Sequence, residues 1–260
     1  MIVRKEPDGS LILIAQTNHA ELSGLLAANW GNKIFARPRP HQSVVRAAIY
    51  HDAGWYKYEA QPFYDVATKS TPNFVQVPPD PIQLEAYQWA IDWVSGIDPY
   101  AGLLVNKHRT GLWAERYHTV SNPPPPPRRP LSELIARFMA YNESRQEQAL
   151  QSLDRNEFAI NYHMLQVWDL LSLYLCGGEH KAQTFEPVPT GYQAADAQGR
   201  RLSVTPIDES KLSIDPYPFD VRPFRVCYAY KHVGGDFSSE AAFLEAYYAA
   251  VPKSNSFEFV

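Results

Sequence analysis

The sequence predicts a mainly α fold, with a helical core over residues 18–178 and a small β-rich unit made by the N-terminal hairpin and the C-terminal segment. Three observations predict it. Apolar residues recur at helical spacing through most of the predicted core. The first fifteen residues have the pattern of a hairpin, and short β-prone runs follow residue 180. Because a lone hairpin is only marginally stable, we expect residues 1–17 and 181–260 to form one small α+β appendage packed on the core.

Turn residues and apolar spacing predict the N-terminal elements. Pro7-Asp8-Gly9 separates two β-prone runs and predicts the hairpin turn. Asn18 is the predicted cap of a first helix that begins with His19, and a second helix begins near His41 after two prolines. Residues 56–81 are long, aromatic and interrupted by proline, which is typical of a loop that covers a site.

Caps, prolines and local β propensity predict the remaining elements. The Pro123–Pro127 tract predicts an extended connector rather than a helix or strand. The later helices are predicted after Pro81, from Asp98-Pro99 to about His118, over 131–150, from Asp154 to Cys176, and from Ser238 or Ser239 to Ala250. The later strands are predicted at 202–207, 211–214, 224–230 and 256–260.

Composition limits the function classes. The chain has 24 Lys+Arg against 28 Asp+Glu, so it lacks the surplus of positive charge that nonspecific nucleic-acid binding requires. It has no run of eighteen apolar residues, so we expect no membrane span, and its charged start is unlike a signal peptide, which predicts a cytoplasmic protein. The two cysteines, Cys176 and Cys227, are too few for a thiolate zinc site. Any metal ligands would therefore be His, Asp and Glu.

Five ionisable residues fall on rows of apolar residues in the predicted helices. They are His19, His51, Asp52, His108 and Asp169. One histidine on an apolar face is more often a hydrogen-bonded core residue, and an aspartate near a helix end is often only a cap. However, buried carboxylates are unfavourable unless they are paired or coordinate a cation. One divalent cation would explain two inward aspartates and three inward imidazoles together.

The order of these residues resembles the HD superfamily of metal-dependent phosphohydrolases. A wider set of motifs resembles DUF3891, a bacterial family of uncharacterised proteins. These motifs are Gln16-x-x-His19-Ala20-x-x-Ser23-Gly24, His51-Asp52-x-Gly54-Trp55, Asn106-x-His108-x-x-Gly111-Leu112, Trp168-Asp169-x-x-Ser172-Leu173 and Asp215-Pro216-Tyr217-Pro218-Phe219. The resemblance spans nearly the whole chain and implies an HD-domain-like helical core.

The resemblance also implies roles for single residues. It implies that His19, His51, Asp52 and Asp169 bind the metal, and that His108 binds substrate phosphate or a second metal. Many HD enzymes carry a lysine shortly after the dyad, but this chain has Ala53-Gly54-Trp55-Tyr56 there, and the first lysine is Lys57. Further candidates replace that lysine or line the site. Lys107 and Arg109 are candidate phosphate contacts, and Trp55 is a candidate to cover the site or stack on a base, although core filling is an equal interpretation.

The leading hypothesis is a phosphohydrolase that acts on a small phosphoester or nucleotide. Asp52, or a second carboxylate near the metal, would orient the attacking water, and His108 would stabilise charge on the phosphoryl group. The cofactor would be one or two divalent ions, with Mn, Fe, Zn, Mg and Ni not distinguished.

One alternative is an HD-type di-iron oxygenase, with His108 and His118 as extra ligands. Another is a non-catalytic metal- or ligand-binding regulatory protein. The high aromatic content is compatible with a homodimer.

Overall fold

Eight helices and eight strands make up the part of the chain that the structure describes. The helices are α1 (Gln16–Ala28), α2 (His41–Tyr50), α3 (Tyr56–Ala60), α4 (Pro81–Ile97), α5 (Pro99–Trp113), α6 (Glu133–Ala149), α7 (Arg155–Cys176) and α8 (Glu240–Ala249). The strands are β1 (Ile2–Lys5), β2 (Leu11–Ile14), β3 (Val120–Ser121), β4 (Gln183–Val188), β5 (Arg200–Pro206), β6 (Lys211–Asp215), β7 (Phe224–Val233) and β8 (Lys253–Phe259). Short 3-10 helices lie at Ala53–Trp55, Phe74–Gln76, Leu150–Ser152 and Asp196–Gln198.

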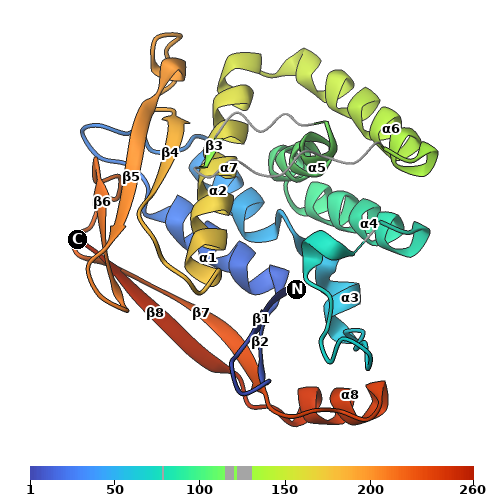
Figure 1. The fold of residues 1–260 in the computed structure, drawn as a ribbon. Helices are drawn as coiled ribbons and strands as arrows, with labels where there is room; N and C mark the ends of the chain where they lie inside the picture. Colours follow the sequence, from blue (N-terminus) through green and yellow to red (C-terminus); the bar gives the residue numbers. More distant parts are fainter. Residues whose placement is uncertain (78, 115–119, 122–130) are drawn as a thin grey trace.

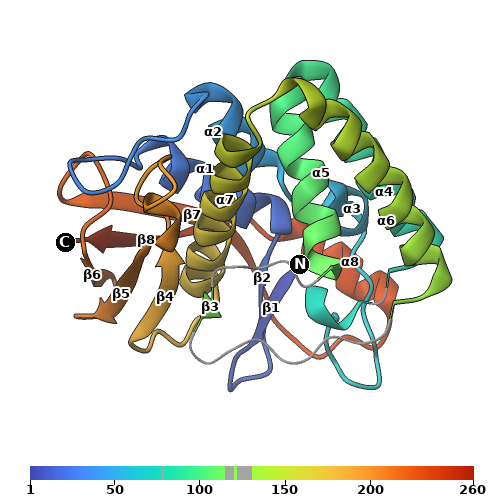
Figure 2. The same cartoon turned by 90° about the horizontal axis from the view of Figure 1, so that it is seen from above.

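The structure is a computed structural model that describes residues 1–77, 79–114, 120–121 and 131–260. About half of the chain is helical, and all eight strands belong to one sheet. Figure 1 shows α1, α2 and α7 within the curve of this sheet, and Figure 2 shows α4, α5 and α6 beyond them, away from the sheet. The mainly α, HD-type core that the sequence predicted is therefore wrong: the β component is a substantial part of the fold.

The sheet has the order β1-β2-β7-β8-β6-β5-β4-β3. Neighbouring strands pair antiparallel, except that β6 and β8 run parallel. The predicted N-terminal hairpin is present, with Ile2 opposite Ile14. Its second strand pairs with β7, where Leu11 lies opposite Val233, so the expected joining of the hairpin to the C-terminal sheet is confirmed.

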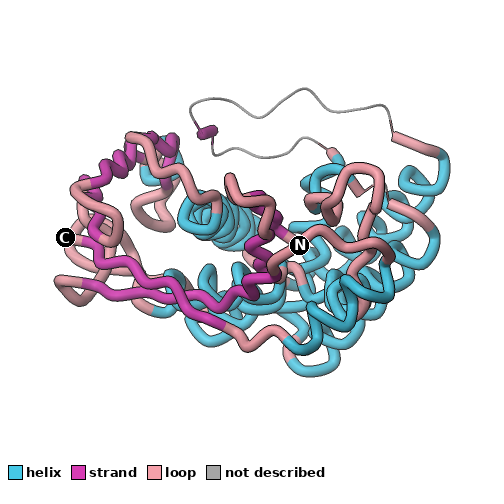
Figure 3. Tube along the Cα trace, turned by 60° about the horizontal axis from the view of Figure 1, so that its bottom comes forward, coloured by secondary structure: helices cyan, strands magenta, loops and turns pink. Residues whose placement is uncertain are grey.

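Helix α7 explains why the fold is not mainly α. Sixteen of the 22 residues of α7 are buried, so other parts of the protein cover the helix on nearly every side. Such a helix needs covering on all of its faces. The tube in Figure 3 shows α7 almost end-on, with strands curling around it and helices on the remaining side. A single hydrophobic cluster accordingly joins Leu165 and Trp168 of α7 with Phe185 of β4 and Phe257 of β8.

Most predicted helix starts are confirmed by their capping contacts. The side chains of Asp80, Asp98, Asp154 and Ser239 accept hydrogen bonds from backbone N–H groups in the first turns of α4, α5, α7 and α8. These bonds satisfy donors that have no partner within the helix. Asp98, Asp154 and Ser239 are short polar residues of the kind that cap helices, which is why the sequence predicted them, whereas the cap at Asp80 was not predicted.

The first helix was predicted with the wrong cap. Helix α1 begins at Gln16, after Ala15, which offers no side-chain cap. Asn18 lies within the helix, and its Nδ2 donates to the backbone oxygen of Ala229 at 2.8 Å. Asn18 therefore holds α1 against strand β7, a long-range contact that local propensity does not reveal.

Some other expectations differ from the structure or fall outside it. Strands β3 and β4 were missed, and residues 56–81 contain α3 and a 3-10 helix rather than a loop alone. The Pro123–Pro127 tract and His118 lie outside the described residues. Within the described chain, no helix combines the length and apolar character needed to cross a membrane.

Helices α1 and α2 approach each other closely at Gly24. A Cβ atom added there would lie 2.2 Å from Cγ1 of Ile49. That distance is far inside van der Waals contact, so α2 can lie against α1 only because residue 24 has no side chain. The approach brings the start of α1 and the end of α2 together, which is where His19 and His51 lie.

We expect Gly24→Ala to destabilise the protein by about 1–2 kcal/mol, because overpacking against Ile49 outweighs the gain in helix propensity. Urea-induced unfolding measures the change. Gly96→Ala is the matched control, because a Cβ at this helical glycine meets nothing within 4 Å. It should be neutral or slightly stabilising. Equal effects of the two variants would contradict the close-packing argument.

Candidate metal centre

Four helical segments carry the predicted site residues to one place. His19 lies in the first turns of α1, His51 and Asp52 directly follow α2, His108 lies in α5, and Asp169 lies in α7. All five are buried, with residue exposures of 5% or less. The structure thus brings together His19, His51, Asp52 and Asp169, the four ligands that the resemblance implies, and His108 lies with them.

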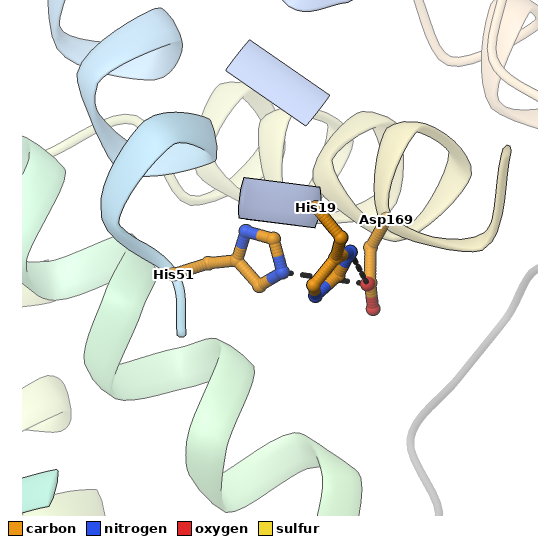
Figure 4. Close-up of side chains that lie close together, drawn as sticks. All are labelled: His19, His51 and Asp169. Atoms are coloured by element: carbon orange, nitrogen blue, oxygen red, sulfur yellow. Dashed lines mark ion pairs between the residues drawn. The ribbon is translucent and has the colours of Figure 1, made fainter. Parts of the chain in front are cut away.

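The ligand atoms form two overlapping groups of three, both of which include His51. One group is His19, His51 and Asp169, and the other is His51, Asp52 and His108. Within each group, the atoms that would bind a metal lie within 4.8 Å of one another. Figure 4 shows the first group, with His51 and His19 both directed toward the carboxylate of Asp169.

Short distances connect the imidazoles with the carboxylates. His19 Nε2 lies 3.1 Å from Oδ2 of Asp52. His51 Nε2 lies 3.3 Å from Oδ1 of Asp169 and 3.9 Å from Oδ2 of Asp52. His108 Nε2 lies 3.8 Å from Oδ1 of Asp52. Three imidazoles therefore present nitrogen atoms to two carboxylates inside the protein.

Hydrogen bonds fix which nitrogen of His51 faces the centre. Its Nδ1 lies 2.8 Å from the backbone oxygen of Ala48, and a carbonyl can only accept, so Nδ1 carries the proton. A neutral His51 therefore directs the lone pair of Nε2 toward Asp169. A second-sphere hydrogen bond of this kind is usual for metal-binding histidines.

His19 is held in the same tautomer by Ser172. The Ser172 hydroxyl donates to the backbone oxygen of Asp169, so it accepts a hydrogen bond from Nδ1 of His19, at 2.8 Å. Nε2 of a neutral His19 then directs its lone pair toward Oδ2 of Asp52. Lone pairs that face carboxylate oxygens repel them unless a cation or a proton lies between.

The charges of the site favour the ligand-competent forms of its carboxylates. Burial would raise the pKa of Asp52, but the neighbouring imidazoles of His108 and His19 hold it well below its usual range. Burial is likewise outweighed at Asp169, where contact with His51 lowers the pKa to about 2. Burial lowers the pKa of His108, whereas at His51 Asp169 outweighs burial and raises the pKa. Both carboxylates are thus ionised at neutral pH.

Arg109 is a buried cation in direct contact with the centre. Its Nη2 donates to Oδ1 of Asp52 at 2.6 Å, and its guanidinium carbon lies 3.9 Å from the centre of the Tyr87 ring. The residue is 6% exposed. The sequence predicted Arg109 as a phosphate contact, but its observed partner is the carboxylate of the His-Asp dyad. That pairing leaves Oδ2 of Asp52 as the oxygen that faces His19 and His51.

The other two predicted site residues lie away from the ligand atoms. Trp55 is 5% exposed and packs against Tyr87 and Phe74, so it fills a small apolar cluster. Lys107 is half-buried and lines a different cavity of about 510 Å³ together with His163. Neither is among the residues that form the two groups of ligand atoms.

Two residues at the site were given no role from the sequence. Ser172 orients His19, and Nε2 of Gln16 donates to Oδ2 of Asp52 at 3.3 Å. Their helical spacing could have identified them, because Gln16 precedes His19 by three residues and Ser172 follows Asp169 by three. Residues three apart share a helix face.

The donor set fits a divalent metal ion. Two imidazoles, each with Nδ1 held by a hydrogen bond and Nε2 directed inward, and two ionised carboxylates form a mixed nitrogen and oxygen set. Such sets suit Mn, Fe, Zn and Ni, and the oxygen ligands also suit Mg. A cation between the inward lone pairs and the carboxylates would remove the repulsion between them. It would thereby explain why the nitrogen atoms and the carboxylate oxygens face one another.

The fold and the site describe an α/β protein with a buried cluster of histidines and aspartates. The chain belongs to the DUF3891 family, which is described as a protein of unknown function and whose family model matches residues 1–234. No curated protein and no solved structure matches the chain. The predicted resemblance to DUF3891 is therefore confirmed, while the relationship to the HD superfamily stays a prediction.

Proposed function

We propose that this protein is a metal-dependent phosphohydrolase that acts on a small phosphoester or nucleotide. The observation that carries this proposal is the convergence of His19, His51, Asp52 and Asp169, far apart in the sequence, in one buried site with oriented ligand atoms. Their order along the chain is that of the ligands in HD phosphohydrolases. A bound divalent ion would supply Lewis acidity, polarising a phosphoryl oxygen and lowering the pKa of water.

The charge of the site supports an anionic substrate. Asp52 and Asp169 contribute two negative charges, and Arg109 contributes one positive charge beside Asp52. One divalent ion would therefore leave the centre with a net charge of about +1, which attracts the negative oxygens of a phosphoester. Without Arg109 the same centre would be neutral.

The residues of the chain have distinct roles in this proposal. Oδ2 of Asp52, held by Gln16 and facing His19, is placed to accept a hydrogen bond from the attacking water and orient it. His108, whose burial favours its neutral form, can donate one hydrogen bond to a phosphoryl oxygen. Arg109 holds Asp52 in place rather than contacting the substrate.

A di-iron oxygenase is the second candidate, and one observation favours it. Three histidines and two aspartates are together enough ligands for two ions, with His51, which belongs to both groups of three, binding only one of them through Nε2. Mixed histidine and carboxylate ligands suit iron as well as zinc or manganese. Metal count and element separate the two candidates, since the oxygenase requires two irons per chain.

The proposal is tested with purified protein loaded in turn with Mn, Fe, Zn, Mg and Ni. We expect bound metal by elemental analysis and hydrolysis of p-nitrophenyl phosphate or a nucleoside monophosphate, lost with chelator and restored by the metal. Bound metal without hydrolysis of any phosphoester would contradict the phosphohydrolase and favour a regulatory metal-binding protein. Two irons with an absorption band in the visible and oxygen consumption would favour the oxygenase instead.

A further inference from the structure

The solvent face of helix α4 is unusually apolar. This helix lies on the side of the molecule away from the sheet (Figures 1 and 2). Its inward face is already packed, with Leu84, Ala90 and Val94 buried. Its outward face nevertheless presents large apolar side chains at helical spacing. These are Ile82, Trp89, Trp93 and Ile97, with exposed fractions of 54%, 53%, 39% and 50%.

Aromatic rings dominate the centre of this face. The rings of Trp89 and Trp93 stack with an angle of 3° between their planes and their centres 5.5 Å apart. Tyr56 of the neighbouring α3 is 65% exposed and lines a hollow beside Trp89. A helix of a monomer normally turns charged and polar residues to solvent, so two half-exposed tryptophans in one stripe mark a surface that another protein covers.

The size of the patch suits a dimer interface. Half-exposed side chains of two tryptophans, one tyrosine and two isoleucines amount to roughly 500 Å² of apolar surface. This area lies within the about 300–600 Å² of the largest apolar patch on a typical monomer, a patch that often has a function, and it matches the apolar share of the about 800 Å² that each partner of a standard interface buries with its polar rim. We call this surface the α4 face, defined by Tyr56, Ile82, Trp89, Trp93 and Ile97.

Two features make the α4 face complementary to itself. It has both the stacked, half-exposed rings of Trp93 and Trp89 and an adjacent hollow of about 390 Å³ lined by Tyr56 and Trp89. The hollow is also lined by Lys57 and Glu85, which have opposite charges and make no ion pair within the described part of the chain. In a two-fold dimer each surface meets its own copy, so a lysine on one side can meet a glutamate on the other.

We propose that the α4 face is the interface of a homodimer, in which two copies pack their tryptophans together and Lys57 of each copy pairs with Glu85 of the other. The inference is independent of the metal centre, because none of the residues of the α4 face belongs to the two groups of ligand atoms. The sequence suggested a homodimer only from the high aromatic content of the chain, whereas the α4 face gives the dimer a defined interface.

The first test measures mass by light scattering and sedimentation at roughly 1–100 µM protein, a range over which the mass action of a dimer is visible. The wild-type chain should be a dimer. The double variant Trp89→Glu with Trp93→Glu should be a monomer, with the dissociation constant raised at least a hundredfold, because each dimer would bury four unpaired carboxylates. Val251→Glu, at a residue 78% exposed and outside the α4 face, should stay dimeric.

A charge exchange provides a second test that does not alter the tryptophans. Lys57→Glu and Glu85→Lys should each weaken their own homodimer, because like charges then meet across the axis. An equimolar mixture of the two variants should form a heterodimer, in which both pairs have opposite charges again. Circular dichroism verifies that each variant is folded. A monomeric wild type, a tryptophan variant as dimeric as the wild type, or a mixture as weakly associated as its components would overturn the proposal.

Discussion

Replacing Asp169 by asparagine is expected to abolish metal binding. The substitution keeps the size of the side chain but removes a charge whose Oδ1 lies 3.3 Å from Nε2 of His51. An amide oxygen is a far weaker ligand for these cations than an ionised carboxylate. Loss of outer-shell contacts alone lowers metal affinity about 10–100-fold, so loss of a ligand should exceed a hundredfold.

Elemental analysis after dialysis against each metal measures the result. Asp236→Asn is a matched control, since it makes the same chemical change at an exposed carboxylate that pairs with Lys69 on the surface. The control should hold as much metal as the wild type. If Asp169→Asn keeps full metal stoichiometry, then Asp169 is not a ligand and the assignment of the centre is wrong.

The candidate site could be predicted because each of its residues can be recognised from the apolar pattern of a single helix. His19, His51, Asp52 and Asp169 each continue a row of apolar residues, and a row on a helix points to one face. Inward ionisable residues need partners, and one shared cation accounts for all of them together, which is why their convergence could be predicted. The wider set of motifs then predicted the DUF3891 family, which the match over residues 1–234 confirms.

Strands β3 and β4, and the enclosure of α7 by one sheet, could not be predicted in the same way. Strand β4 alternates poorly, with only Phe185 and Val188 buried, so its residues 183–188 carry a weak periodic signal. One signal was present: residues 158–176 are apolar on nearly all sides, and a helix of that kind is enclosed rather than placed at the edge of a bundle. Which elements enclose it depends on long-range pairing, such as β7 with β8, that no local pattern encodes.

The pairing of Arg109 with Asp52 was also beyond sequence reasoning. Arg109 follows His108 directly, and adjacent residues on a helix point in different directions. The long arginine side chain overcomes this by lying across the ring of Tyr87 to reach Asp52. Side chains of such length and freedom are placed by packing, which is set only once the fold is complete.

The second large effect is expected for Arg109→Met, which should respond to metal in the opposite direction from Asp169→Asn. Methionine keeps the unbranched apolar stem of the side chain but removes the guanidinium group, and with it the charge that is paired with Asp52. Breaking a buried ion pair from one side typically destabilises by about 3–5 kcal/mol, because the other charge stays buried. We expect a loss of that size in the metal-free protein.

A divalent ion should recover much of this loss. The ion would neutralise Asp52 in place of the arginine and would no longer be repelled by it, so Arg109→Met should bind metal more tightly than the wild type. A ligand present at a hundred times its dissociation constant stabilises a fold by about 2.7 kcal/mol, and tighter binding increases that figure. Urea unfolding of both proteins, with and without metal, measures the difference.

Arg37→Met separates the effect of the centre from that of losing any arginine. Arg37 pairs with Asp220 at the surface, where such pairs contribute about 1 kcal/mol or less. Its stability should change little, and the gain on adding metal should equal that of the wild type. If metal stabilises Arg109→Met no more than it stabilises Arg37→Met, the ion does not neutralise Asp52. In that case the buried aspartate serves only to hold Arg109, and the centre has lost the ligand on which its proposed chemistry depends.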